Sequence, residues 1–279
     1  MLNDYEFWFV VGSQFLYGPE VLETVSARAA EMADALNASG NLPCKIVYKV
    51  TAKTNAEITD LVREANYSKH CAGLITWCHT FSPGKMWING FAALQKPYCH
   101  FATQYNREIP NEGIDMDFMN LNQAAHGDRE FGYIVSRLGI KRKVVVGHYT
   151  DPEVAEKLGT WARACAGWDA SNNMKVMRWG DNMRNVAVTE GDKTEAERVF
   201  GASINTWAVN ELVAAYDAVK DDQVKEIIED YKAKYDVDPA LLDAKYDSLF
   251  IAAKEEAAMV NMMRANGCTA GVDNFEDLG

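Results

Sequence analysis

The sequence has no basic cluster and little positive charge overall. Lysine and arginine together number 28, against 40 aspartates and glutamates, so the 279 residues carry a formal net charge of −12. Binding to nucleic acid or to an anionic membrane surface requires a cationic footprint. The charge balance therefore argues against both kinds of partner.

Long apolar runs and targeting signals are also missing. No stretch approaches the roughly 18 apolar residues of a membrane span, and the first residues lack the basic and apolar regions of a secretory signal. The six cysteines contain no C-x-x-C pair: Cys44, Cys71, Cys78, Cys99, Cys165 and Cys268. Such cysteines are typical of reduced, buried thiols rather than of disulfides or a zinc site. We therefore expect a cytoplasmic protein.

Familiar catalytic motifs are absent as well. The sequence has no G-x-G-x-x-G, Walker A, G-x-S-x-G or H-E-x-x-H motif, which disfavours a nucleotide-dependent oxidoreductase and the common hydrolases. His126 and Asp128 lie two residues apart, which is a weak metal signal. His70 and His100 have no partner nearby in the sequence, so we expect them to be structural. We predict no metal site within these residues.

The sequence does contain a regular alternation of strand and helix patterns. Apolar runs of strand length precede helical periodicities at 6–11, 45–50, 72–78, 97–101 and 143–147. Right-handed crossovers between such strands give a doubly wound parallel sheet. The pattern restarts with a strand at 175–179, three helices, the last opened by Pro239, and a strand at 268–272. We therefore predict an α/β protein with domains at 1–172 and 173–279, the second one incomplete.

The central stretch is 71–90. Its apolar run, 72–78, shows no alternation, which is typical of a strand covered on both faces. The run ends at His79 and Thr80. We expect Ser82 to cap the following helix, with Pro83 in the first turn.

Polar residues follow four of the expected strands. They are Gln14, His79 with Thr80, Thr103 with Gln104, and His148 with Tyr149. The carboxyl ends of parallel strands share one edge of a sheet, where ligands bind. Neutral amide, hydroxyl and imidazole groups there suit a polyhydroxylated ligand. The alternative, in which each residue only caps a helix or satisfies a loop carbonyl, stays open.

A longer irregular insert, 102–122, separates the fourth and fifth strands. The stretch 113–130, which overlaps its end, mixes Asp, Asn, Gln, His and Arg with Met and Phe, and it has two interpretations. One interpretation is a connector whose side chains cap the helix behind it. The other is a polar lip that faces a ligand or a neighbouring subunit, since inserts of this length are commonly functional. We favour the second interpretation.

Long motifs spread over the whole chain resemble the L-arabinose isomerase family. They lie at 5–14, 79–83, 85–90, 114–123, 180–184, 205–209 and 275–278. The resemblance implies an L-fucose/L-arabinose isomerase-like fold and conversion of L-arabinose to L-ribulose in arabinose catabolism, with D-galactose to D-tagatose as a second reaction. It also implies a divalent cation, usually manganese, that assists proton transfer through an enediol. Members of the family form homo-oligomers, usually hexamers.

The resemblance also implies substrate-binding residues. In the family, the amino-terminal domain of one subunit covers the active site of the next. The matching positions here are Gln14, Leu16, Tyr17, Phe81, Gln123 and His126. Met183 and Phe275 match residues that line the sugar pocket from the subunit that holds the metal.

One departure from the family concerns the metal ligands. The family's two metal-binding glutamates and two metal-binding histidines follow the Phe-Glu-Asp-Leu motif, which here occupies 275–278. We therefore expect no catalytic residue and no bound cation in these 279 residues, and no turnover by them alone. A second hypothesis is a non-catalytic module that binds a sugar or regulates an isomerase.

Overall fold

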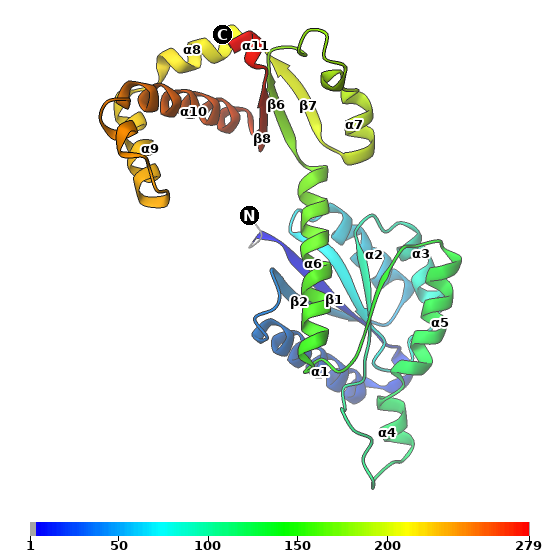
Figure 1. Cartoon of the computed structure of the whole chain (residues 1–279). Helices are drawn as coiled ribbons and strands as arrows, with labels where there is room; N and C mark the ends of the chain where they lie inside the picture. The colour runs from blue at the N-terminus through cyan, green and yellow to red at the C-terminus, as the bar shows by residue number, and fades with distance from the viewer. Residues whose placement is uncertain (1–3, 279) are drawn as a thin grey trace. The chain divides into compact units, whose positions relative to one another are not determined.

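A computed structural model describes residues 4–278, and the chain divides into two compact units between Asp169 and Ala170. Each unit contains a parallel β-sheet with helices (Figure 1). The predicted α/β class is therefore confirmed. Among the helices of residues 4–278, none combines the length and the apolar composition that crossing a bilayer needs.

Unit 1 is built on five strands that pair in parallel in the order β2-β1-β3-β4-β5. Their bounds are β1 Glu6–Gly12, β2 Lys45–Ala52, β3 Cys71–Trp77, β4 Tyr98–Ala102 and β5 Lys143–Val146. Every residue of β3 is buried, as expected for a central strand without apolar alternation. The five predicted strands are thus all present.

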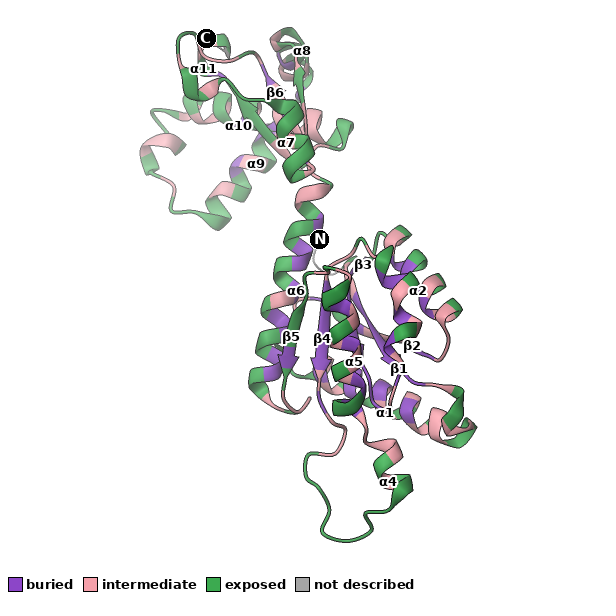
Figure 2. Cartoon of the chain, turned by 90° about the vertical axis from the view of Figure 1, so that its right-hand side faces the viewer, coloured by how far each residue is buried: buried purple, intermediate pink, exposed green. Residues whose placement is uncertain are grey.

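Helices cover both faces of this sheet. Successive side chains of a strand point to opposite faces, so Phe7 and Phe9 of β1 join one core cluster while Trp8 and Val10 join the other. The first cluster includes side chains of α1 Pro19–Ala38 and α6 Pro152–Asn172. The second includes α2 Asn55–Tyr67, α3 Ile88–Ala92 and α5 Ala124–Arg137. Figure 2 shows the buried strands between these layers. The sheet is therefore doubly wound.

The strand order creates a switch point between β1 and β3. These strands are neighbours, yet α1 follows β1 on one face while α3 follows β3 on the other. The two connections therefore diverge at the carboxyl edge of the sheet. Open α/β sheets bind ligands at such a point.

The predicted helix start at Ser82 is wrong. The chain instead makes a 3-10 turn, Gly84–Trp87, before α3, and the Ser82 hydroxyl accepts a hydrogen bond from the Trp87 indole at 3.0 Å. A buried indole N–H needs an acceptor, and this one draws Ser82 into the core. The Gly84 N–H is donated to the Glu130 carboxylate at 2.7 Å.

The insert between β4 and β5 contains a short helix that the sequence reading missed. This helix, α4 Met116–Leu121, begins with Asp115, whose carboxylate accepts the Phe118 N–H at 2.8 Å. An aspartate in this position satisfies one of the free N–H groups of the first turn. The segment is largely exposed (Figure 2).

Unit 2 has three parallel strands in the order β7-β6-β8. They are β6 Lys175–Trp179, β7 Ser203–Trp207 and β8 Ala270–Asp273. The helices are α7 Lys193–Phe200, α8 Val209–Ala218, α9 Asp221–Lys234, α10 Tyr246–Asn266 and α11 Phe275–Leu278. Neither α7 nor β7 was predicted, because β7 is polar and has no fully buried residue. Pro239 does not open α10, because it begins a separate 3-10 turn, Pro239–Leu242, that Asp238 caps.

We predict that Phe131→Ala destabilises unit 1 by about 3–5 kcal/mol. The Phe131 ring on α5 is buried and packs edge-to-face against Trp87 and Phe91, with ring centroids 4.9 Å and 5.6 Å apart. Truncation to alanine therefore leaves a cavity. Urea unfolding followed by tryptophan fluorescence measures the change. The matched control is Tyr133→Ala on the exposed side of the same helix, for which we expect about 0.5 kcal/mol or less. Equal effects of the two changes would contradict this core assignment.

Candidate functional site

Two loops meet at the switch point of unit 1. The Gln14 side-chain amide, just after β1, donates to the Phe81 carbonyl at 3.2 Å. The Phe81 N–H, in the loop after β3, donates to the Tyr17 hydroxyl at 3.2 Å. Closer to the core, the hydroxyls of Ser13 and Thr80 lie 2.6 Å apart. The loops that follow β1 and β3 are therefore fastened to each other.

A third element, α5, completes this arrangement. The imidazole of His126 stacks on the Phe81 ring with centroids 4.7 Å apart and planes inclined by 22°. We call Gln14, Tyr17, Phe81 and His126 the switch-point cluster. Three segments far apart in the sequence thus contribute side chains to one place.

The two remaining predicted residues of unit 1 are next to this cluster in the chain. Leu16 belongs to the 3-10 turn Phe15–Tyr17, and its side chain is 81% exposed. Gln123 precedes α5, and its carbonyl accepts the His126 N–H at 3.1 Å. Its side-chain amide donates to Asn120 at 3.0 Å.

The chemistry available in the switch-point cluster is neutral and adaptable. An amide and a phenol hydroxyl can both donate and accept hydrogen bonds, and a neutral imidazole has one nitrogen for each role. Phe81 adds an aromatic face, while His126 is exposed and Gln14 and Tyr17 are half-buried. This combination can contact the hydroxyl and C–H groups of a sugar.

His79 and Thr80 follow β3 as expected, but both are fully buried, so the prediction that they face a ligand at the sheet edge is wrong. The His79 ring stacks on Trp77 with centroids 4.3 Å apart, and its Nε2 lies 3.2 Å from the Arg28 guanidinium. Burial and, to a lesser extent, the positive charge of Arg28 together lower the pKa of His79 to about 3. Arg28 can only donate, so the Nε2 of neutral His79 is the acceptor.

Other residues predicted to face a ligand at the sheet edge have local partners. Thr103 is buried, and its carbonyl accepts the Trp77 indole N–H at 3.0 Å. His148 uses both ring nitrogens, with the Tyr105 carbonyl at 3.0 Å and the Thr150 hydroxyl at 2.8 Å. For these residues the alternative interpretation, satisfaction of loop groups, describes the structure.

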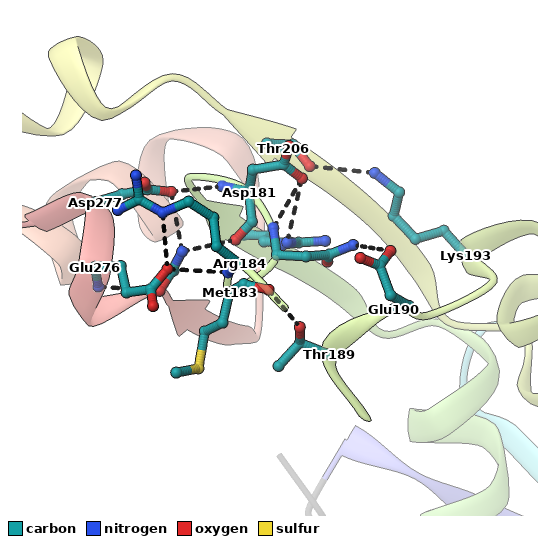
Figure 3. A network of polar contacts seen from close by, with 12 residues as sticks. Asp181, Met183, Arg184, Thr189, Glu190, Lys193, Thr206, Glu276 and Asp277 are labelled. Carbon is teal, nitrogen blue, oxygen red and sulfur yellow. Dashed lines mark hydrogen bonds and ion pairs between the residues drawn. The ribbon is translucent and has the colours of Figure 1, made fainter. Parts of the chain in front are cut away.

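Unit 2 contains the other two predicted residues, Met183 and Phe275. The Asp181 N–H donates to the Asp277 carboxylate at 2.8 Å, and the Arg184 N–H donates to Glu276 at 3.0 Å (Figure 3). These bonds join the loop after β6 to α11. The segments that carry Met183 and Phe275 are therefore held together by backbone N–H groups and carboxylates.

Phe275 also borders an apolar cavity. Its side chain is 71% exposed and, with residues of α8 and α10, lines a cavity of about 750 Å³. Two glutamates of α10, Glu255 and Glu256, lie at this cavity. The Met183 side chain is partly exposed in the loop after β6.

The described residues do not fit the divalent cation that the family resemblance implies. Within residues 4–278 no three or more histidine, cysteine, aspartate or glutamate side chains are grouped so that they could hold a metal ion. His126 stacks on Phe81, and Asp128 is hydrogen bonded to His100 at 2.8 Å.

The sequence reading missed the Asp128–His100 contact and the role of Arg28. Both contacts join residues far apart in the sequence, 28 positions for Asp128 and His100 and 51 for Arg28 and His79. The only available signal was that Asp128 occurs two residues after His126.

We predict that His79 makes stability depend on pH. Between pH 6.5, the ordinary pKa of histidine, and about 3, its pKa in the fold, the unfolded chain binds a proton at His79 that the folded chain does not. This contribution therefore makes the free energy of unfolding rise with pH across that window and level off above it. His79→Gln should show a shallower rise in urea titrations between pH 4 and 7. Identical pH profiles of the two proteins would contradict a buried neutral His79.

Two family models together match nearly the whole chain. The model of the L-arabinose isomerase N-terminal domain matches residues 1–173, and that of the L-arabinose isomerase central domain matches residues 175–279.

Curated relatives agree with these matches. An L-arabinose isomerase of Bifidobacterium longum (strain DJO10A) is 80% identical over 274 residues, which are 98% of this chain and 54% of the relative. That of Arthrobacter sp. (strain FB24) is 51% identical over 280 residues, 100% of this chain and 55% of the relative. The chain spans about half the length of the curated relatives it matches. The resemblance predicted from the motifs is confirmed: this chain belongs to the L-arabinose isomerase family.

Proposed function

We propose that the protein to which these residues belong converts L-arabinose to L-ribulose, with D-galactose to D-tagatose as a second reaction. One observation carries this proposal: a relative named L-arabinose isomerase is 80% identical over 98% of the chain. The activity is proposed for a protein of the relatives' full length, because the chain spans 54% of this relative.

The switch-point cluster, with Leu16 and Gln123, is our candidate for the part of unit 1 that contacts the sugar. We propose that it covers the active site of a neighbouring subunit. The 81% exposure of Leu16 and the exposed His126 support this role, because a covering surface must project from its own unit. Its neutral donors and acceptors match sugar hydroxyls, which also both donate and accept.

Met183 and Phe275 are our candidates for the pocket wall contributed by the subunit that holds the metal. We propose that the carboxylate and imidazole ligands come from the part of the relatives that this chain does not span. When bound, a divalent cation such as Mn²⁺ supplies Lewis-acid polarisation of the sugar oxygens. The residues described here would bind and orient the sugar.

We also propose a homo-oligomer, a hexamer as the family resemblance implies, in the cytoplasm. The covering role of unit 1 requires at least two subunits at each site. All six cysteines are free thiols, five of them buried, which suits a reducing compartment.

The activity can be tested in a hybrid protein of the relatives' full length. Residues 1–279 would be fused to the remaining carboxyl-terminal part of the Bifidobacterium longum relative, and ketose formation from L-arabinose measured with Mn²⁺ present. We expect metal-dependent formation of L-ribulose by this hybrid and none by the 279 residues alone. A folded, oligomeric hybrid without turnover would contradict the proposed activity. Turnover by the shorter chain would contradict the proposed source of the metal ligands.

The shared site predicts complementation between two damaged subunits. In the hybrid, His126→Ala and Met183→Ala should each lower kcat/KM by roughly tenfold, which corresponds to about 1.4 kcal/mol of lost transition-state binding. Co-expression of the two variants should restore native kcat/KM at a fraction of the sites, since one subunit supplies an intact unit 1 and its neighbour an intact unit 2. Mixed oligomers with no restored activity would show that both residues act within one subunit.

A further inference from the structure

We infer that Asp128 and His100 are positioning residues, which hold the first turn of α5 so that His126 is presented at the switch-point cluster. This inference rests on the proposed role of His126 in sugar binding, and it adds two residues that the family resemblance did not single out. The contact joins β4 to α5, and it lies two residues from His126.

The contact is the end of a buried hydrogen-bond chain. The Tyr98 hydroxyl lies 3.0 Å from the Thr76 hydroxyl, which lies 2.9 Å from His100 Nδ1, and His100 Nε2 lies 2.8 Å from Asp128 Oδ1. The first three residues belong to β3 and β4 and are buried. The Asp128 side chain is 20% exposed.

One assignment of hydrogens lets every donor in this series of four residues make one hydrogen bond. The Asp128 carboxylate accepts, so His100 Nε2 carries a hydrogen. His100 Nδ1 then accepts from Thr76, and Thr76 accepts from Tyr98. Burial raises the pKa of Tyr98 well above its usual value, which keeps that hydroxyl protonated and able to donate. The chain of bonds therefore fixes the His100 ring in one orientation toward Asp128.

The start of α5 depends on such tertiary contacts. Gln123 occupies the N-cap position, but its side chain makes no capping bond. Three tertiary contacts hold the start of α5 instead. Asp128 bonds to His100, Glu130 accepts the Gly84 N–H at 2.7 Å, and Gly127 packs closely against Cys78. A Cβ added at Gly127 would lie 3.1 Å from the Cys78 Cβ.

His126 directly precedes these anchors and differs from them in exposure. It is exposed, whereas Gly127 is buried and Asp128 reaches into the sheet. Small rotations of the first turn would therefore move the His126 ring across Phe81. Glu130 fixes the turn along the loop after β3, while the Asp128–His100 pair fixes it against β4.

The first test follows the His126 ring directly in the 279-residue chain. Its proton resonances report the ring current of Phe81, and the chain contains five histidines to assign. We expect Asp128→Ala to shift the His126 signals toward those of a free histidine. Asp128→Asn keeps an acceptor for His100 and should retain most of the native shift. The control is Asp60→Ala on α2, which removes an exposed carboxylate and should leave the signals unchanged.

His100→Leu removes the donor from the other side of the pair and should move the same signals. Native His126 shifts in folded Asp128→Ala would overturn the inference. If both Asp128→Ala and His100→Leu are unfolded, the pair stabilises unit 1 as a whole rather than one turn, and the inference also fails.

The second test uses the hybrid enzyme described above. Asp128→Ala should raise KM for L-arabinose about tenfold with a smaller change in kcat, and Asp128→Asn should recover most of the loss. If Asp128 acts through His126, the change should have little further effect in a His126→Ala background. An undiminished effect there would overturn the inference. An inactive native hybrid contradicts the proposed function instead, because the resonance measurement decides the positioning role without turnover.

Discussion

The site in unit 1 depends on the parallel pairing of β1 with β3. Because these neighbours continue into helices on opposite faces, their loops separate at the carboxyl edge and leave backbone and side-chain groups free to face outward. The bonds of Gln14 and Tyr17 to the Phe81 backbone fasten the two loops across this gap. Gln14 and Tyr17 lie a few residues after β1, and Phe81 lies a few residues after β3. A shift in the pairing register of β1 and β3 would therefore break the bonds between the two loops.

Adjacent residues after β3 differ in burial and therefore in role. His79 and Thr80 are fully buried and anchor the loop, whereas Phe81 extends to meet His126. Ser82 turns inward again to bond Trp87. His79 is buried because its ring stacks on Trp77 in the aromatic core beneath the loop. A rigid, buried support thus carries a small projecting surface.

Much of the fold could be predicted from the sequence, because an unbroken apolar run such as 72–78 has few structural alternatives. The polar strand β7 could not, since its residues show no apolar pattern. Gln14, Phe81 and His126 were predicted from the long family motifs. The parallel arrangement of the expected strands also placed Gln14 and Phe81 at the same edge of the sheet. The burial of His79 and the Asp128–His100 bond could not be predicted, because each depends on side-chain partners far away in the sequence.

We propose that the switch-point cluster faces a sugar bound by a neighbouring subunit. A crystal structure of the hybrid enzyme with a bound pentitol tests it most directly. We expect sugar hydroxyls within hydrogen-bond distance of Gln14 or His126 from the adjacent subunit, beside the Phe81 ring. A sugar bound far from all of these residues, with His126 open to solvent, would contradict it.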